Sequence, residues 1–105
     1  MAWQRVANLG GIPVSGLLRT QAGSIEILII RDGEKLFATS LRCTHENDDL
    51  SNGMLEGGNL ICSFHYATFN PSTGAVVSAP EDGGDVKPLK VYDVKVENDE
   101  VLVNI

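Results

Sequence analysis

The cysteines and histidines of this chain are few and tightly grouped. Cys43 and His45 have one residue between them, and Cys62 and His65 have two. These four residues are all the cysteine and histidine in the 105-residue sequence, and sixteen residues separate the two pairs. A single cysteine is often just a small buried apolar residue, but that explanation does not account for two mixed pairs. Metal binding or redox chemistry is the better interpretation.

Three kinds of site use cysteine together with histidine. Nucleophilic catalysis needs one of each and would leave the second pair without a role. Tetrahedral zinc accepts two of each, although a cysteine pair followed by a histidine pair is its usual order. A [2Fe–2S] centre with two histidines on one iron needs two ligands for each iron. Mixed pairs on two loops suit this centre, with Cys43 and Cys62 on one iron and His45 and His65 on the other. Zinc stays open as the alternative.

Composition limits the classes of protein that fit. The chain is 43% apolar and 21% charged, which is ordinary for one ordered globular domain. Its net charge of -6 argues against nucleic acid as a partner, because binding phosphates requires a basic surface. The longest apolar run, residues 27–30, is far shorter than the roughly 20 residues that span a bilayer. With no signal-peptide pattern at the N-terminus, we expect a cytoplasmic protein that binds no membrane.

Strand signals dominate the two ends of the chain. Residues 24–30 and 35–41 are rich in β-branched and aromatic residues, with an Asp-Gly turn between them. Residues 91–97 alternate apolar and polar side chains, and residues 98 and 99 lead into a partner strand over 100–105. No segment has the periodicity of a substantial helix. These patterns predict an antiparallel all-β fold with two hairpins.

The middle of the chain has a different character. Residues 42–59 are polar, acidic and glycine-rich, which predicts a long loop, and long ordered loops are usually functional. A short strand over 59–63, a loop over 64–70 and a turn over 71–74 are expected next. We predict a single domain of residues 1–105. Its β base is formed by residues 1–41 and 81–105, and a cluster-binding segment of about residues 42–80 is inserted between them.

The pattern C-T-H, then sixteen residues, then C-x-x-H resembles Rieske-type ferredoxins and Rieske domains. The resemblance covers about residues 25–105 and is greatest to the ferredoxins of bacterial ring-hydroxylating dioxygenase systems. It implies an antiparallel β-sandwich base with an inserted cluster-binding subdomain. It also implies one [2Fe–2S] cluster held by the two pairs. The further matching positions are Leu50, Gly53, Leu55, Phe69, Thr73, Gly74, Pro80 and the terminal V-Y-D-V-K-V-E-N-D-E-V pattern.

Departures from the family pattern sharpen the expected function. Ser63 and Tyr66 stand where many members have proline and glycine. The dioxygenase ferredoxins vary at both positions, so neither departure threatens the assignment. The chain lacks the further cysteines of high-potential members. Ala67 and Phe69 stand where those members carry hydroxyl residues. Fewer hydrogen bonds to the cluster sulfurs favour a low potential.

The same resemblance implies a carrier of electrons without catalytic activity of its own. Both histidines are assigned to the cluster, and 105 residues leave no room for a mononuclear iron domain. The expected role is a monomeric one-electron carrier between a flavin-dependent reductase and a terminal oxygenase. A Rieske carrier for another redox partner and a zinc-binding structural or regulatory module are the alternatives.

The sequence also suggests where electrons leave. We expect His45 and His65 at an exposed tip, with Cys43 and Cys62 facing inward. The acidic residues that follow the first pair have two interpretations that stay open. They either line a docking face for a basic patch on the partner or belong to a solvated loop. These residues are Glu46, Asp48 and Asp49.

Overall fold

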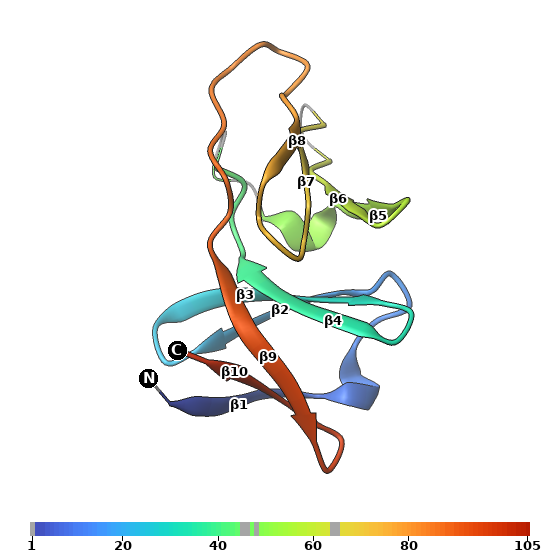
Figure 1. The fold of residues 1–105 in the computed structure, drawn as a ribbon, viewed down its shortest axis with the longest axis vertical. Helices are drawn as coiled ribbons and strands as arrows, with labels where there is room; N and C mark the ends of the chain where they lie inside the picture. Colours follow the sequence, from blue (N-terminus) through green and yellow to red (C-terminus); the bar gives the residue numbers. More distant parts are fainter. Residues whose placement is uncertain (1, 45–46, 48, 64–65) are drawn as a thin grey trace.

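The base of the molecule is a six-stranded antiparallel sheet (Figure 1). A computed structural model describes residues 2–44, 47, 49–63 and 66–105. Every strand pair in it is antiparallel, which confirms the predicted all-β antiparallel fold. The sheet consists of β1 (Trp3–Asn8), β2 (Leu17–Ala22), β3 (Ile25–Asp32), β4 (Lys35–Ser40), β9 (Val91–Glu97) and β10 (Glu100–Asn104).

The six strands fold over into two facing halves. Their order is β1-β10-β9-β4-β3-β2, and Figure 1 shows β1 and β10 beneath β2, β3 and β4, with β9 running down from the upper strands to the lower ones. The two edge strands of the sheet, β1 and β2, also lie close together. The Thr20 hydroxyl of β2 donates to the Val6 carbonyl of β1 at 2.7 Å. The space between the halves is filled by an apolar core, whose buried members are Ala22, Ile27, Ile29, Ala38, Val101 and Val103.

Both predicted hairpins are present. Asp32 pairs with Lys35 across the first turn, where Gly33 has a φ of +63°. Glu97 pairs with Glu100 across the second. The two residues of that second turn, 98 and 99, have φ values of +51° and +63°. Two-residue hairpin turns with positive φ match the right-handed twist of the strands, and asparagine and aspartate tolerate this conformation.

A second sheet of four short strands lies above the base in Figure 1. Its strand order is β5-β6-β7-β8, and all its residues lie between β4 and β9 in sequence. The predicted loop over residues 42–59 is therefore only partly a loop, because it contains a 3₁₀ turn and one of these strands. The elements are η2 (Leu50–Asn52), β5 (Met54–Glu56), β6 (Asn59–Ile61), β7 (Thr68–Phe69) and β8 (Val76–Ser78).

Strand β3 holds the two sheets together. Ile27 and Ile29 lie in the core of the base, whereas Leu28 and Ile30 belong to a second apolar cluster that contains residues of the upper sheet. Alternate side chains of a strand point to opposite faces, so β3 is buried on both sides. The upper sheet is thereby packed directly on the base.

The chain returns to the base through residues 79–90. This segment is attached at three places. The Lys87 amide donates to the Thr44 hydroxyl at 2.9 Å, the Leu89 amide to the Gly74 carbonyl at 2.8 Å, and the Ser40 amide to the Lys90 carbonyl at 2.8 Å. Gly74 has a φ of +77°, and a side chain there would collide with the Leu89 carbonyl. Only glycine fits this contact.

Candidate metal centre

The structure describes two of the four predicted ligands. Cys43 is 2% exposed and Cys62 is 1% exposed, and no disulfide joins them. Both belong to the second apolar cluster, together with residues of β3, η2, β6 and β7. His45 and His65 lie outside the described residues. Two thiols that are 19 residues apart in sequence are thus brought into one buried cluster at the upper sheet.

The first cysteine opens a short loop whose ends are pinned together. Arg42 and Asp49 form an antiparallel bridge, and next to it the Leu50 amide donates to the Leu41 carbonyl at 2.9 Å. Inside the loop the amide of residue 47 donates to the Cys43 carbonyl at 2.9 Å. This geometry holds the Cys43 backbone from both sides.

The second cysteine opens the loop between β6 and β7. Leu60 pairs with Phe69 and Ile61 with Thr68, and the Cys62 amide donates to the Ala67 carbonyl at 2.8 Å. Only residues 63–66 lie between these two closing positions. The loop is therefore a tight hairpin connection that starts at a buried cysteine.

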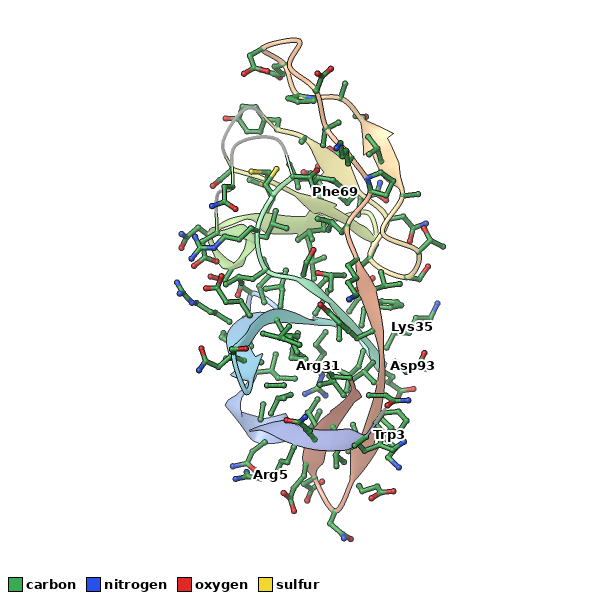
Figure 2. All side chains as sticks on the ribbon, turned by 90° about the vertical axis from the view of Figure 1, so that its left-hand side faces the viewer. Trp3, Arg5, Arg31, Lys35, Phe69 and Asp93 are labelled. Carbon is green, nitrogen blue, oxygen red and sulfur yellow. The ribbon has the colours of Figure 1, made fainter. Side chains whose placement is uncertain are left out.

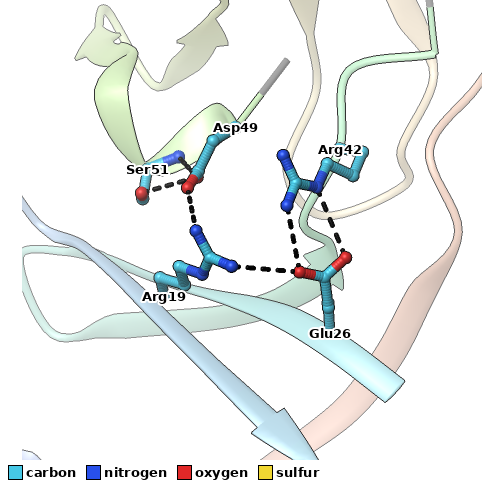
Figure 3. Close-up of polar contacts among 5 residues, drawn as sticks. All are labelled: Arg19, Glu26, Arg42, Asp49 and Ser51. Carbon is cyan, nitrogen blue, oxygen red and sulfur yellow. Dashed lines mark hydrogen bonds and ion pairs between the residues drawn. The ribbon is translucent and has the colours of Figure 1, made fainter. Parts of the chain in front are cut away.

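An ion-pair network fixes the first loop to the base sheet (Figure 3). Arg19 of β2 contacts Asp49 at 2.8 Å and Glu26 of β3 at 3.2 Å, and Arg42 contacts Glu26 at 3.1 Å. The Asp49 carboxylate also accepts the amide of Ser51 at 2.9 Å and its hydroxyl at 2.6 Å, which caps η2. Arg42, which precedes Cys43, and Asp49, which closes the loop, are thus bound to β3 and β2 of the base.

The network lowers the pKa of both carboxylates. Burial raises the pKa of Asp49, but hydrogen bonds from Ser51 and Arg19 outweigh it, so the pKa is below its ordinary value. A hydrogen bond from Arg42 is the main cause of the lowered pKa of Glu26. The Asp49 side chain is only 14% exposed and pairs with Arg19 of β2, so it attaches the loop to the base, and a docking face of acidic residues stays a prediction. Glu46 and Asp48 lie outside the described residues.

Two hydroxyl groups in or beside the two loops have protein partners. The Thr44 hydroxyl donates to the Lys87 carbonyl, and the Thr68 hydroxyl donates to the Tyr66 carbonyl at 3.2 Å. Ala67 and Phe69 are fully buried in the cluster that contains both cysteines. The surroundings of the described thiols are therefore mainly apolar.

The described part of the site fits an iron–sulfur centre. Thiolates ligate iron and zinc alike, and a dry apolar environment limits the access of water to a metal. Two buried cysteines, each at the start of a pinned loop, meet these conditions. Among the residues that the structure describes, no helix is long and apolar enough to cross a membrane.

Comparison with known proteins decides the family. Residues 2–101 match the Rieske [2Fe-2S] domain. This chain belongs to the Rieske [2Fe-2S] domain family. The family's [2Fe–2S] cluster is therefore its cofactor, and the resemblance identified from the sequence is confirmed.

Relatives of this Rieske protein are ferredoxins. It is 33% identical to the ferredoxin component of biphenyl 2,3-dioxygenase from Rhodococcus jostii (strain RHA1), over 100% of this chain and 94% of the relative. It is 36% identical to the ferredoxin CarAc of Metapseudomonas resinovorans, over 96% and 92% of the two chains. A solved complex of reduced oxygenase and oxidized ferredoxin in carbazole 1,9a-dioxygenase contains a similar chain, with a TM-score of 0.81 and 32% identity. The match covers 96% of this chain and 91% of that chain.

Sequence reasoning found the cysteines but missed their supports. Arg19 and Glu26 carry no motif, and Arg19 is 30 residues from the aspartate that it contacts. The Thr44 hydroxyl reaches a backbone 43 residues away. The one local signal was an Asp-Leu-Ser sequence at residues 49–51, which is consistent with an aspartate that caps the short 3₁₀ turn.

Proposed function

We propose that this chain is a low-potential one-electron carrier that passes electrons from a flavin-dependent reductase to a terminal oxygenase. The observation that carries the proposal is the burial of Cys43 and Cys62 in one apolar cluster, in a chain of the Rieske family. The ferredoxin relatives support a carrier without catalytic activity of its own.

Four residues hold the cofactor in this proposal. Cys43 and Cys62 ligate one iron of a single [2Fe–2S] cluster, and His45 and His65 ligate the other. The cluster supplies the capacity to take up and release one electron. The segment of about residues 42–80 forms the cluster-binding subdomain, inserted in a base of residues 1–41 and 81–105.

Each part of the chain has a distinct task in the transfer. The apolar cluster around the two cysteines keeps water from the thiolates, and the pinned loops keep ligand positions similar in both oxidation states. A rigid ligand shell lowers the structural change that accompanies each transfer. His45 and His65 form the electron exit toward the partner. The chain acts as a cytoplasmic monomer that docks transiently.

The low potential follows from the apolar surroundings. The described hydroxyls of Thr44, Ser51 and Thr68 each donate to an oxygen of the protein. Ala67 and Phe69 bring none. Fewer hydrogen bonds to the cluster sulfurs stabilise the more negative reduced state less.

Anaerobic stopped-flow spectroscopy tests the proposal. The reduced holo protein is mixed in turn with the oxidised oxygenase components of biphenyl and carbazole dioxygenases. We expect the visible absorbance of the oxidised cluster to return, at a rate that rises with oxygenase concentration. A stable reduced cluster in the presence of either oxygenase would contradict the proposed partner class while leaving the cofactor assignment intact.

A further inference from the structure

Tyr66 adopts a backbone conformation that its residue type disfavours. Its φ is +61°, in the left-handed region. Three other non-glycine residues in the described part of the chain have positive φ, and they are Asn47, Asn98 and Asp99. Asparagine and aspartate tolerate this region because their short polar side chains bond locally, whereas a bulky side chain crowds the following carbonyl. Of the four described non-glycine residues with positive φ, Tyr66 alone has a bulky side chain that does not tolerate this region.

The loop, not the tyrosine, requires this conformation. Tyr66 is the last of the four residues between Cys62 and Ala67, whose backbones close the β6–β7 hairpin. A left-handed residue at the end of such a short loop returns the chain to the partner strand. Glycine or asparagine would meet the same requirement with less strain. The presence of tyrosine therefore needs a reason other than the fold.

The tyrosine side chain contributes little to the core. It is 50% exposed, while its neighbour Ala67 is fully buried. Tyr66 also directly follows the predicted ligand His65 in sequence. A strained residue that the surrounding structure holds in place is typical of functional sites, and exposed tyrosines are enriched among the residues that dominate protein interfaces.

We propose that Tyr66 is a partner-contact residue, which inserts its ring into an apolar recess on the terminal oxygenase when the two proteins dock. This inference rests on the proposed electron-carrier function, and the solved complex of a similar ferredoxin with its oxygenase supports an oxygenase as the occupant. An aromatic contact suits a transient carrier, because a ring has few rotatable bonds to order on binding. It also anchors the complex at the cluster end of the chain.

The test compares holo proteins carrying Tyr66→Gly, Tyr66→Asn and Tyr66→Phe. We expect Tyr66→Gly and Tyr66→Asn to unfold at the same temperature as the wild type or higher, since both relieve the left-handed strain. Their second-order rates of electron transfer to the biphenyl and carbazole oxygenases should fall roughly tenfold or more, as for other truncated interface anchors. Tyr66→Phe keeps the ring and should retain most of the rate.

Two controls separate docking from other effects. Trp3→Ala removes another partly exposed aromatic ring, from the far end of the molecule (Figure 2), and should leave the rate unchanged. The midpoint potential and the salt dependence of the rate should be the same in Tyr66→Gly as in the wild type, because the ring carries no charge.

Three results would overturn the inference. The first is an unchanged rate in Tyr66→Gly, and the second is a fall in its unfolding temperature, which would mean that the ring is kept for stability. The third is a shift in potential large enough to explain the slower transfer. If the wild type itself reduces neither oxygenase, the proposed function fails, and the oxygenase contact fails with it. If the wild type transfers electrons to the oxygenases and Tyr66→Gly does so at the same rate, the Tyr66 contact is refuted and the proposed function stands.

Discussion

At the scale of single residues, Arg19 and Arg42 link the loop that begins at Cys43 to the base sheet. Cys43 and Cys62 were predicted from two short motifs, and both prove to be buried in one cluster. For Asp49, which follows a ligand motif in a polar stretch, the sequence left open whether it lines a docking face or belongs to a solvated loop. Its actual role depends on Arg19, and a contact between residues 30 apart depends on how the strands pair. Local sequence carries no signal of that kind.

Removing the Asp49 carboxylate should destabilise the fold in a pH-dependent way. Asp49→Ala loses the cap on Ser51 and the ion pair with Arg19, so we expect about 1–2 kcal/mol less free energy of unfolding at pH 7. The folded pKa of Asp49 is lowered, so the carboxylate stabilises the fold fully above its unfolded pKa of about 3.9. This stabilisation is lost as the pH falls through the folded pKa.

Thermal unfolding of the wild type and Asp49→Ala from pH 7 to pH 3 measures this effect. The difference between the two proteins should narrow as the pH falls below about 4. Asp93→Ala removes an exposed carboxylate on β9 (Figure 2) and serves as the control, with an expected change within about 0.5 kcal/mol. A difference that stays constant over this pH range would contradict the assigned role of Asp49.

Adding a hydroxyl beside the cysteines should raise the potential. The wild type is expected near the low end of the Rieske range, about -150 mV. Ala67→Ser, or Phe69→Tyr, should raise it by on the order of 50 mV, which is about 1 kcal/mol for one electron, if the new hydroxyl reaches a cluster sulfur. Ala38→Ser adds the same group in the other core and should cause no shift. Spectroelectrochemical titration measures the midpoint potential of each protein. A wild-type midpoint well above 0 mV would refute the low potential assigned to this chain.

At the scale of elements, strands with a strong pattern were predictable and those without one were not. The four strands of the two hairpins were identified because their apolar runs or alternation are clear. β1 is mostly exposed and its burial does not alternate regularly. β5 has three residues and β7 has two, which is too short to show the alternation of apolar and polar side chains that marks a strand. The run at residues 27–30 was recognised as a strand. Its burial on both faces follows from the upper sheet, which the run alone does not reveal.

Loss of the cofactor should loosen the two ligand loops more than the strands beside them. The loops are closed by hydrogen bonds from the amides of Asn47 and Cys62, whereas β6 and β7 share an apolar core with β3. Metal binding and local folding are coupled. In apo protein, hydrogen exchange at these two amides should accelerate strongly, with smaller changes in β6 and β7. The amides of β10 serve as the internal control, and equal protection of loops and β10 would contradict the prediction.

At the scale of the whole molecule, the shape separates the site from the base. The chain measures 43 × 26 × 19 Å, and along the long axis the six-stranded sheet lies at one end and the four-stranded sheet at the other (Figure 1). Both termini lie at the base, where residues 2 and 105 exchange backbone hydrogen bonds. Cys43 and Cys62 belong to the apolar cluster shared with the four-stranded sheet, away from the termini (Figure 1). The net charge of -6 suits encounter with a basic surface.

The central claim is that Cys43, His45, Cys62 and His65 hold one [2Fe–2S] cluster. Metal and sulfide analysis of anaerobically purified protein tests it most directly, applied to the wild type and to the four single alanine variants. We expect about two irons and two sulfides per chain in the wild type, with severe depletion of both in every variant. Stoichiometric zinc without iron in the wild type would contradict the claim, and so would full iron and sulfide content in any one of the variants.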